Sequence, residues 1–167
     1  MRFFRHRLRR RRAAVPSVFA LLVAFAAAGC TSTDEAASAA VPSPDASTAT
    51  FCRHLDRQLP RRVDDLSRVD PTPQSALTAG WGDPAIILRC GVPRPAQMDD
   101  PKERSVEVNG VDWIEEKNDD GSYRLTTTLR KAYVEVIIPE QRTARGLNPI
   151  IDLAPAVQKT IPHGIAG

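Results

Sequence analysis

Three cysteines carry the most readily assigned chemistry in this chain: Cys30, Cys52 and Cys90. A cysteine thiol can be acylated, can bind a metal as a thiolate, or can form a disulfide with a second cysteine. Cys30 directly follows a basic and then apolar N-terminal stretch, whereas Cys52 and Cys90 lie in a region of mixed composition. Cys30 therefore indicates where the protein is located, and the other two cysteines remain as a pair.

Residues 1–29 have the three parts of an export signal. Seven arginines and no acidic residue lie between Arg2 and Arg12, and an apolar run from Ala13 to Gly29 closes on small residues. This run contains Pro16 and is shorter than the roughly 20 apolar residues that span a membrane. We expect residues 1–29 to be removed as a signal peptide. The pair Arg11-Arg12 resembles a twin-arginine signal, so both the Sec and the twin-arginine export routes remain open.

The residues before Cys30 resemble the bacterial lipobox, in which the cysteine thiol receives a diacylglyceryl group and cleavage leaves that cysteine first. Ala28 and Gly29 match the pattern, whereas Ala27 stands where this motif usually has leucine. The resemblance implies a lipid anchor on the outer face of the cytoplasmic membrane, which two or three acyl chains make stable. The alternative is a freely secreted protein in which Cys30 is unmodified.

The excess of basic residues belongs to this leader. The chain has 23 basic and 20 acidic residues, and seven of the basic residues lie in the leader. The remainder therefore has 16 basic and 20 acidic residues. A mildly acidic domain does not attract nucleic acid, so we expect no nucleic-acid partner.

Cys52 and Cys90 are expected to form a disulfide, because an exported chain meets oxidising surroundings and Cys30 is assigned to lipid. The bridge would close a loop of about 39 residues and stabilise the domain by roughly 4 kcal/mol. A metal site is the alternative, with His54 beside Cys52 and His163 near the end of the chain. These residues lack the short ligand spacing of a zinc site, so we expect no metal and no cofactor.

We expect one folded domain at residues 51–167, after a flexible linker at residues 30–50. The linker is rich in Ala, Ser, Thr and Pro, and Val41 is its only sizeable hydrophobic residue. Such a composition buries too little apolar surface to offset the entropy of ordering. The remainder of the chain is long enough for one modest core.

Helical periodicity occurs near both ends of this domain. Apolar residues recur at intervals of three and four from Cys52 to Leu66, with Pro60 as a kink or as the start of a second short helix. A C-terminal helix is expected from Leu153 to about Thr160, with Asp152 as its N-cap and Pro155 in its first turn.

Strand signals occupy the region between these helices. The apolar run 85–88 lies between turn signals, and Asn109-Gly110 between alternating hydrophobic residues predicts a hairpin that returns along 111–117. A second turn at 119–121 and strands at 123–128 and 133–138 complete the pattern. The sequence therefore predicts an α+β fold: an antiparallel sheet of about four to five strands with N- and C-terminal helices packed on one face.

Four segments resemble the hallmark segments of one protein family. They read WGDP at 81–84, LRCGV at 88–92, VNGVDW at 108–113 and YVEV at 133–136. Together, within a similarity that runs from about Cys52 to Ile161, they resemble an actinobacterial lipoprotein family, domain of unknown function 3515. The resemblance implies an envelope lipoprotein without an established activity.

The sequence shows no recognisable catalytic constellation, so we expect the protein not to be an enzyme. It has no Gly-x-Ser-x-Gly motif and, if the disulfide forms, no free thiol. The acidic pairs at 99–100 and 119–120 fall in an expected loop and turn, where acids commonly cap and solubilise. For a binding site the first candidates are Trp81, Asp83, Arg89 and Trp113, for which core and turn roles are the alternative.

These observations favour a lipid-anchored, non-enzymatic protein that binds or scaffolds another envelope component, either a protein or a part of the cell wall. A small-ligand carrier is one alternative, and it needs an apolar cavity between the sheet and the helices. A hydrolase that modifies the envelope is another, and a freely secreted protein follows if Cys30 carries no lipid.

Overall fold

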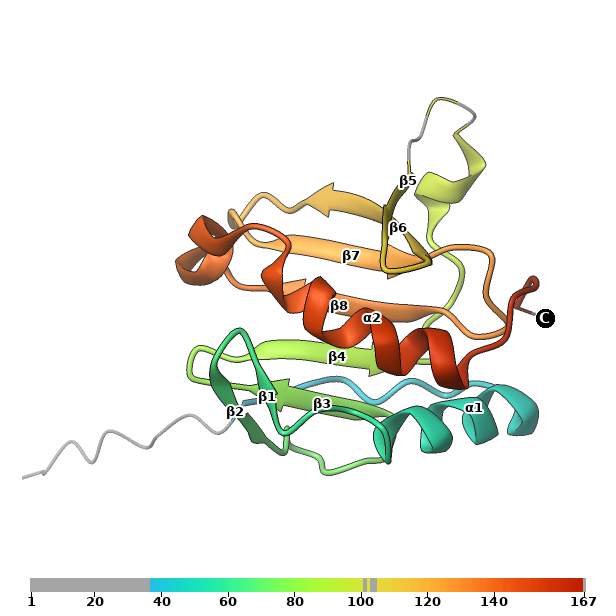
Figure 1. Ribbon diagram of the computed structural model, residues 1–167, viewed down its shortest axis with the longest axis horizontal. Coiled ribbons are helices and arrows are strands. Elements are labelled where there is room, and N and C mark those ends of the chain that lie inside the picture. The colour runs from blue at the N-terminus through green and yellow to red at the C-terminus, as the bar shows by residue number, and fades with distance from the viewer. Residues whose placement is uncertain (1–36, 101, 103–104, 167) are drawn as a thin grey trace, which may run out of the picture. The chain divides into compact units, whose positions relative to one another are not determined.

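The computed structural model describes residues 37–100, 102 and 105–166, so the expected signal peptide and Cys30 lie outside the described residues. The described residues form two α-helices, two 3-10 helices and eight strands (Figure 1). In chain order these elements are α1 Ala46–Asp56, β1 Arg62–Val63, β2 Leu66–Val69, β3 Thr78–Trp81, β4 Ile86–Cys90, η1 Ala96–Asp99, β5 Ser105–Val108, β6 Val111–Lys117, β7 Tyr123–Thr127, β8 Val134–Ile138, η2 Glu140–Arg145 and α2 Asn148–Thr160.

All eight strands belong to one antiparallel sheet with the order β1-β2-β3-β4-β8-β7-β6-β5. The α+β class and the antiparallel sheet are thus confirmed. The Asn109-Gly110 hairpin is confirmed as well, since both residues have positive φ and β5 pairs with β6 on either side of them.

The predicted count of four to five strands is wrong, because the sheet has eight. The three missed strands precede β4, and they are short: β1 has two residues, and β2 and β3 have four each. β3 also reads TAGW and is buried along its whole length, so it shows neither alternation nor a run of large apolar residues.

The predicted N-terminal helix is wrong in its boundaries. α1 begins at Ala46, where the Asp45 carboxylate accepts hydrogen bonds from the N–H groups of Ser47 and Thr48, and it ends at Asp56. Val63 and Leu66, which continue the three-and-four spacing, are instead a cross-strand pair of the β1–β2 hairpin. Asp64 and Asp65 form its two-residue turn, and both have left-handed φ.

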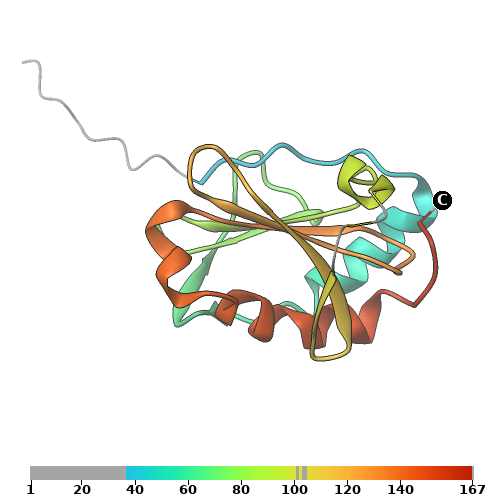
Figure 2. The same cartoon turned by 90° about the horizontal axis from the view of Figure 1, so that it is seen from above.

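The predicted linker is wrong for residues 37–50, which belong to the domain. Residues Ala37–Pro44, here called the strap, run in extended form along the sheet face that carries no α-helix (Figure 2). Their backbone is held at Thr72, which donates to the Ala37 carbonyl at 2.7 Å and accepts from the Ala39 N–H at 3.1 Å. The Arg89 Nε donates to the Ala40 carbonyl at 2.9 Å. Backbone and arginine hydrogen bonds therefore order a segment that has little apolar surface of its own.

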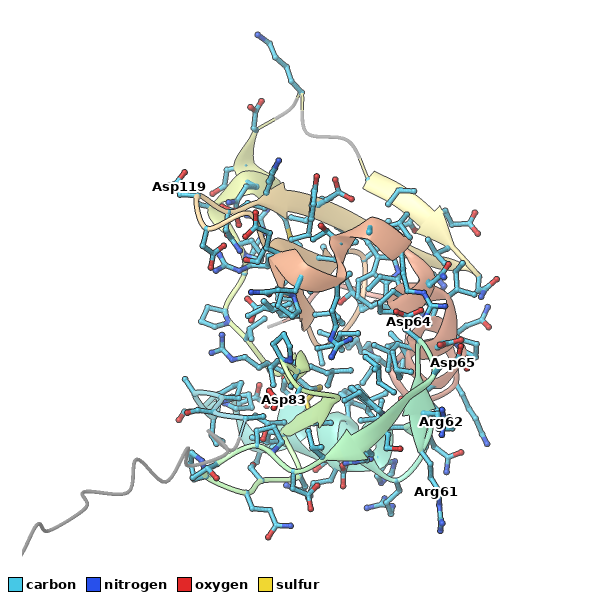
Figure 3. The ribbon with its side chains drawn as sticks, turned by 90° about the vertical axis from the view of Figure 1, so that its left-hand side faces the viewer. Arg61, Arg62, Asp64, Asp65, Asp83 and Asp119 are labelled. Carbon is cyan, nitrogen blue, oxygen red and sulfur yellow. A yellow bond between two sulfur atoms is a disulfide. The ribbon has the colours of Figure 1, made fainter. Side chains whose placement is uncertain are left out.

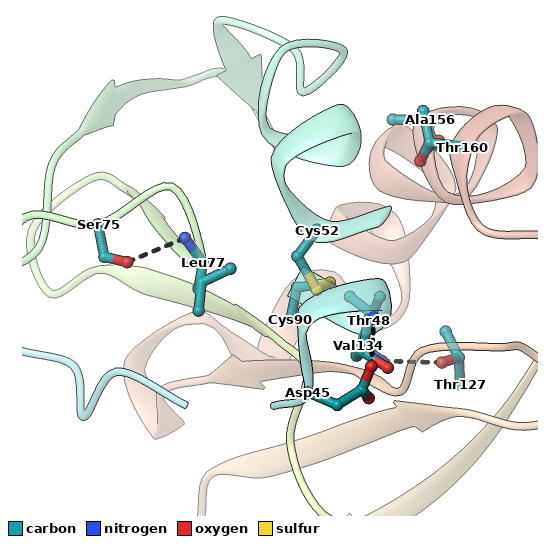
Figure 4. Close-up of a disulfide and its surroundings, with 10 residues drawn as sticks. All are labelled: Asp45, Thr48, Cys52, Ser75, Leu77, Cys90, Thr127, Val134, Ala156 and Thr160. Atoms are coloured by element: carbon teal, nitrogen blue, oxygen red, sulfur yellow. Dashed lines mark hydrogen bonds between the residues drawn. A yellow bond between two sulfur atoms is a disulfide. The ribbon is translucent and has the colours of Figure 1, made fainter. Parts of the chain in front are cut away.

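The hydrophobic core lies between the sheet and both helices. Alternate residues of the central strands face the helices and are buried, for example Leu88 and Cys90 of β4 and Val134 and Val136 of β8. The Cys52–Cys90 disulfide is confirmed: it joins α1 to β4 with 5.5 Å between the Cα atoms (Figure 4). Both cysteines are 1% exposed, so the bridge is part of the core.

The C-terminal helix is confirmed but starts earlier than predicted. α2 begins at Asn148, with Pro149 in its first turn, so Asp152 is inside the helix rather than at its N-cap. The Asp152 carboxylate instead accepts the N–H of Asp64 at 2.7 Å and so ties the β1–β2 turn to α2. In the described part of the chain, neither α-helix has the length and apolar character needed to cross a membrane.

Candidate functional site

The two tryptophans predicted as binding residues are core residues. Trp81 on β3 and Trp113 on β6 are both 0% exposed, and three strands lie between theirs in the sheet. At the usual spacing of strands this places them roughly 19 Å apart. The Trp81 indole donates to the Pro60 carbonyl at 3.1 Å, and the Arg68 guanidinium lies over its ring. Neither ring presents a free face for stacking.

Asp83 and Arg89 lie in different surroundings from the tryptophans and from each other. Asp83 is exposed in the β3–β4 turn, where its carbonyl accepts a hydrogen bond from Arg142 at 2.7 Å. Arg89 is on the helix-free face of the sheet, where it pairs with Glu135 at 2.9 Å. Trp81, Asp83, Arg89 and Trp113 are therefore not gathered into one site.

A groove at one end of the helix-free face is the strongest candidate site. Its volume is about 310 Å³, and we call it the Leu129 groove. Ile114 of β6 and Tyr133, which directly precedes β8, are buried in its wall, while Leu129 and Ile165 lie exposed along its rim. A second hollow of the same volume adjoins it and shares Arg94 and Tyr133 with it. The second hollow extends to the C-terminal end of the strap, at Ser43 to Asp45.

Two large apolar side chains are exposed along the Leu129 groove, beside the exposed polar residues Arg94, Asp100 and Ser105. Leu129 is 61% exposed and Ile165 is 79% exposed, the highest values among the large hydrophobic residues that the structure describes. Single exposed hydrophobic residues are common on soluble domains, but two along one groove are typical of an interaction site.

The backbone at Leu129 is held in an unfavourable conformation. Its φ is 52°, in the left-handed region, which costs a residue with a Cβ atom roughly 1–2 kcal/mol. The Leu129 carbonyl accepts the N–H of Gly164 at 3.0 Å, and the Lys131 N–H donates to the Pro162 carbonyl at 3.0 Å. These bonds attach the loop to the C-terminal segment that carries Ile165.

Arg130 fixes the same loop from inside the domain. It is 1% exposed, and its guanidinium donates to the carbonyls of Ile161 at 2.9 Å and Gly110 at 2.6 Å. Burial lowers the pKa of Arg130, and the nearby Asp112 carboxylate opposes that effect. One side chain thus connects three segments: the Leu129 loop, the β5–β6 hairpin and the end of α2.

The η1 side of the groove is also held in place. The Arg94 guanidinium forms an ion pair with Asp99 and donates to the Met98 carbonyl at 2.9 Å. The hydrogen bond to Asp99 raises the pKa of Arg94. Arg94 therefore stays a cation, and both of its terminal nitrogens donate to its own loop.

Two other hollows are weaker candidates than the Leu129 groove. One, of about 230 Å³, is lined by Asp64, Asp65, Asp152 and Arg145, and its buried Asp64 carboxylate is paired with Arg145 at 3.3 Å. Within residues 37–100, 102 and 105–166, no three His, Cys, Asp or Glu side chains are grouped so as to hold a metal ion. The other is an apolar cavity of about 180 Å³ between the sheet and the η2 segment. It is smaller than the ligand pockets of roughly 300–1,000 Å³ that proteins commonly use.

Comparison with known proteins places the chain in a family. Residues 12–165 match the family model described as "Protein of unknown function (DUF3515)". The chain belongs to this family. No curated protein and no solved structure matches the chain.

The four segments that suggested the DUF3515 family occupy structural positions in this domain. Residues 81–84 run from the end of β3 into the β3–β4 turn, and residues 88–92 include the disulfide cysteine of β4. Residues 108–113 lie in the β5–β6 hairpin, and residues 133–136 lead into β8. Sequence reasoning missed Leu129, Arg130 and Ile165, which line or support the groove. The only signal was an isolated leucine between a threonine run and two basic residues, which has no helical or strand periodicity.

Proposed function

We propose that this DUF3515 protein is exported, is anchored by lipid on Cys30, and uses its domain to bind another envelope protein. The Leu129 groove is the proposed binding site, and its occupant is an extended segment that carries apolar side chains. The exposure of Leu129 and Ile165 is the single observation that carries this proposal.

The disulfide supports the export part of the proposal. Structural disulfides persist in oxidising compartments and are rare in the cytosol. Cys52 and Cys90 bridge two elements of the core and are 1% exposed, which is typical of a structural bridge rather than a catalytic one. Together with the leader that precedes Cys30, this favours a domain that folds outside the cytoplasm.

The geometry of the groove supports a protein occupant rather than a wall glycan. Sugar sites commonly present aromatic rings, whereas both tryptophans are 0% exposed and Tyr133 is 6% exposed. The most exposed apolar side chains of the rim, Leu129 and Ile165, are aliphatic and suit the apolar side chains of a peptide. The exposed Arg94, Asp100 and Ser105 make part of the lining polar.

The neighbouring sheet edge supports an extended occupant. β5 ends the strand order, and its first residue, Ser105, lines the groove. An edge strand offers unpaired backbone N–H and C=O groups, and an added strand can pair with them. The side chains of the added strand would then reach Leu129 and Ile165.

A small-ligand carrier has less support. The apolar cavity between the sheet and the η2 segment is about 180 Å³, which accommodates only a very small molecule. The Leu129 groove is wider, but its rim of exposed aliphatic residues does not enclose a ligand.

Co-purification from detergent-solubilised membranes tests the proposal. The full-length chain is compared with Leu129→Asn and with Ile151→Asn, a matched control because Ile151 is 48% exposed on α2, outside the groove. We expect one envelope protein to co-purify with the wild type and with Ile151→Asn, and to be lost with Leu129→Asn. Equal recovery with all three chains would contradict a binding role for the groove.

A further inference from the structure

The strap determines which end of the domain faces the membrane. We infer that the end where the strap begins, at Ala37, lies against the bilayer, and that the Leu129 groove lies at the opposite end and opens away from it. This inference rests on the proposed lipid anchor at Cys30 and adds an orientation to it. The surface involved is the strap-entry end of the domain, and its partner is a lipid bilayer.

The length of chain between the anchor and the domain limits their separation. Six residues separate Cys30 from Ala37, the first residue that the structure describes. Seven residue steps span at most about 25 Å, because a fully extended chain advances roughly 3.3–3.6 Å per residue. A linker that reached to residue 50 would span up to about 70 Å. Docking of the strap on the sheet therefore shortens the maximum distance between Cys30 and the folded domain nearly threefold.

The strap holds its position through contacts at both ends. Near its start, Ala37 and Ala39 are hydrogen-bonded to Thr72, and near its middle Arg89 donates to the Ala40 carbonyl. At its end, Pro44 packs on Gly91 so closely that a Cβ atom on that glycine would lie 2.6 Å from the proline ring. The entry point cannot move toward the groove without breaking these contacts.

The strand register places the groove at the other end of the sheet. β4 runs from Ile86, next to the β3–β4 turn, to Cys90, and Gly91 follows on the side of the groove. In Figure 1 the strap begins on the left, and the C-terminal segment that carries Ile165 lies on the right. A domain of this length is about 35 Å across. The groove is therefore held a domain length from the membrane, where an extended segment of another protein can reach it.

Surface charge does not itself draw the strap-entry end to lipid. Figure 3 looks at that end, where the charge is mixed: Asp83 and Asp119 are exposed in the β3–β4 and β6–β7 turns, and Arg61 and Arg62 are exposed at the start of β1. Anionic headgroups attract the arginines and repel the aspartates, so the two effects oppose each other. Contact between this end of the domain and the bilayer thus depends on the acyl chains and the short tether. The domain without lipid should not bind vesicles of anionic lipid.

Fluorescence quenching in vesicles tests this orientation. The lipidated full-length protein, processed to its mature form, is reconstituted in phosphatidylglycerol–phosphatidylethanolamine vesicles that carry nitroxide headgroups. A fluorophore is attached at Asp83→Cys or at Ile165→Cys, and Ile165 is 79% exposed. We expect quenching at position 83 to exceed quenching at position 165 severalfold. A flexible insertion of twenty residues between Ser32 and Thr33 should abolish that difference.

The outcomes separate this inference from the proposed function. Equal quenching at both positions, or stronger quenching at position 165, in a protein whose mass shows acyl chains on Cys30 would overturn the orientation alone. A mature mass without acyl chains would overturn the lipid anchor and the orientation together. Sedimentation of a Cys30→Ala chain with anionic vesicles would contradict the dependence on the tether.

Discussion

Leu129 and Arg130 are adjacent in the chain and occupy opposite environments: Leu129 is 61% exposed, whereas Arg130 is 1% exposed. Arg130 donates to two backbone carbonyls inside the domain, and the chain turns through a left-handed φ at Leu129. The buried arginine therefore holds the apolar side chain beside it at the surface. A loop that costs both backbone strain and apolar exposure is typical of an interaction site.

Replacing Leu129 should separate stability from binding. Asparagine tolerates a left-handed φ better than leucine does, so Leu129→Asn should raise the free energy of unfolding by up to about 1 kcal/mol. The same change removes an exposed apolar contact and should abolish partner binding. Urea denaturation and co-purification measure the two effects, and a large loss of stability would contradict an interaction role for this side chain.

Replacing Arg130 should destabilise the domain. Arg130→Met leaves the buried carbonyl of Ile161 and the partly buried carbonyl of Gly110 without their donors, which costs about 2–4 kcal/mol. Arg130→Lys keeps a charge but not the forked geometry, so its loss should be intermediate. Chemical denaturation should rank the wild type as most stable, Arg130→Lys next and Arg130→Met least. Equal stability of all three would contradict the role of Arg130 in connecting these segments.

Removing the disulfide should lower stability without changing the fold. The bridge closes a loop with a sequence separation of 38, so the Cys52→Ser, Cys90→Ser chain should lose about 4 kcal/mol of unfolding free energy. Thiol labelling of the native wild-type protein should modify neither cysteine. Rapid labelling of both thiols in the folded protein isolated from cells would show that the bridge does not form.

The Asp45 cap should make stability depend on pH. Hydrogen bonding from Thr48, and then from Ser47, holds the pKa of Asp45 well below its ordinary value. A lowered folded pKa stabilises the fold above the unfolded pKa of about 3.9, and this contribution is lost as the pH falls toward the folded value. The thermal midpoint of the wild type should therefore fall more steeply below about pH 4 than that of Asp45→Asn, which keeps a capping oxygen but no charge. Parallel curves for the two chains would contradict this assignment.

The sequence predicted the elements whose pattern is local. Asn109-Gly110 and the acidic turn at 119–121 mark hairpins through turn chemistry alone, and the Cys52–Cys90 pair followed from counting thiols in a chain that we expect to be exported. The same reasoning failed for β1 and β2, because Val63 and Leu66 have a helical spacing although they pair across a two-residue turn. Local periodicity does not distinguish the two arrangements when strands are this short.

The strap and the groove were beyond prediction because contacts distant in sequence create them. The strap is ordered by Thr72 and Arg89, which lie more than thirty residues away. The exposure of Leu129 depends on Arg130 reaching a hairpin and a helix end. Amino-acid composition predicts neither the ordered strap nor the exposed Leu129, because both depend on where the fold places hydrogen-bond partners.

Site-specific photocrosslinking in intact cells tests most directly whether the groove binds an envelope protein. A photoreactive side chain is placed at Leu129 in the full-length chain and, as a matched control, at Ile151, which is 48% exposed on α2. We predict one discrete crosslinked envelope protein from position 129, none from position 151, and loss of the adduct when Ile165→Asn is added. Adducts of equal yield from both positions, or no adduct from position 129 in cells that contain the processed protein, would contradict the account.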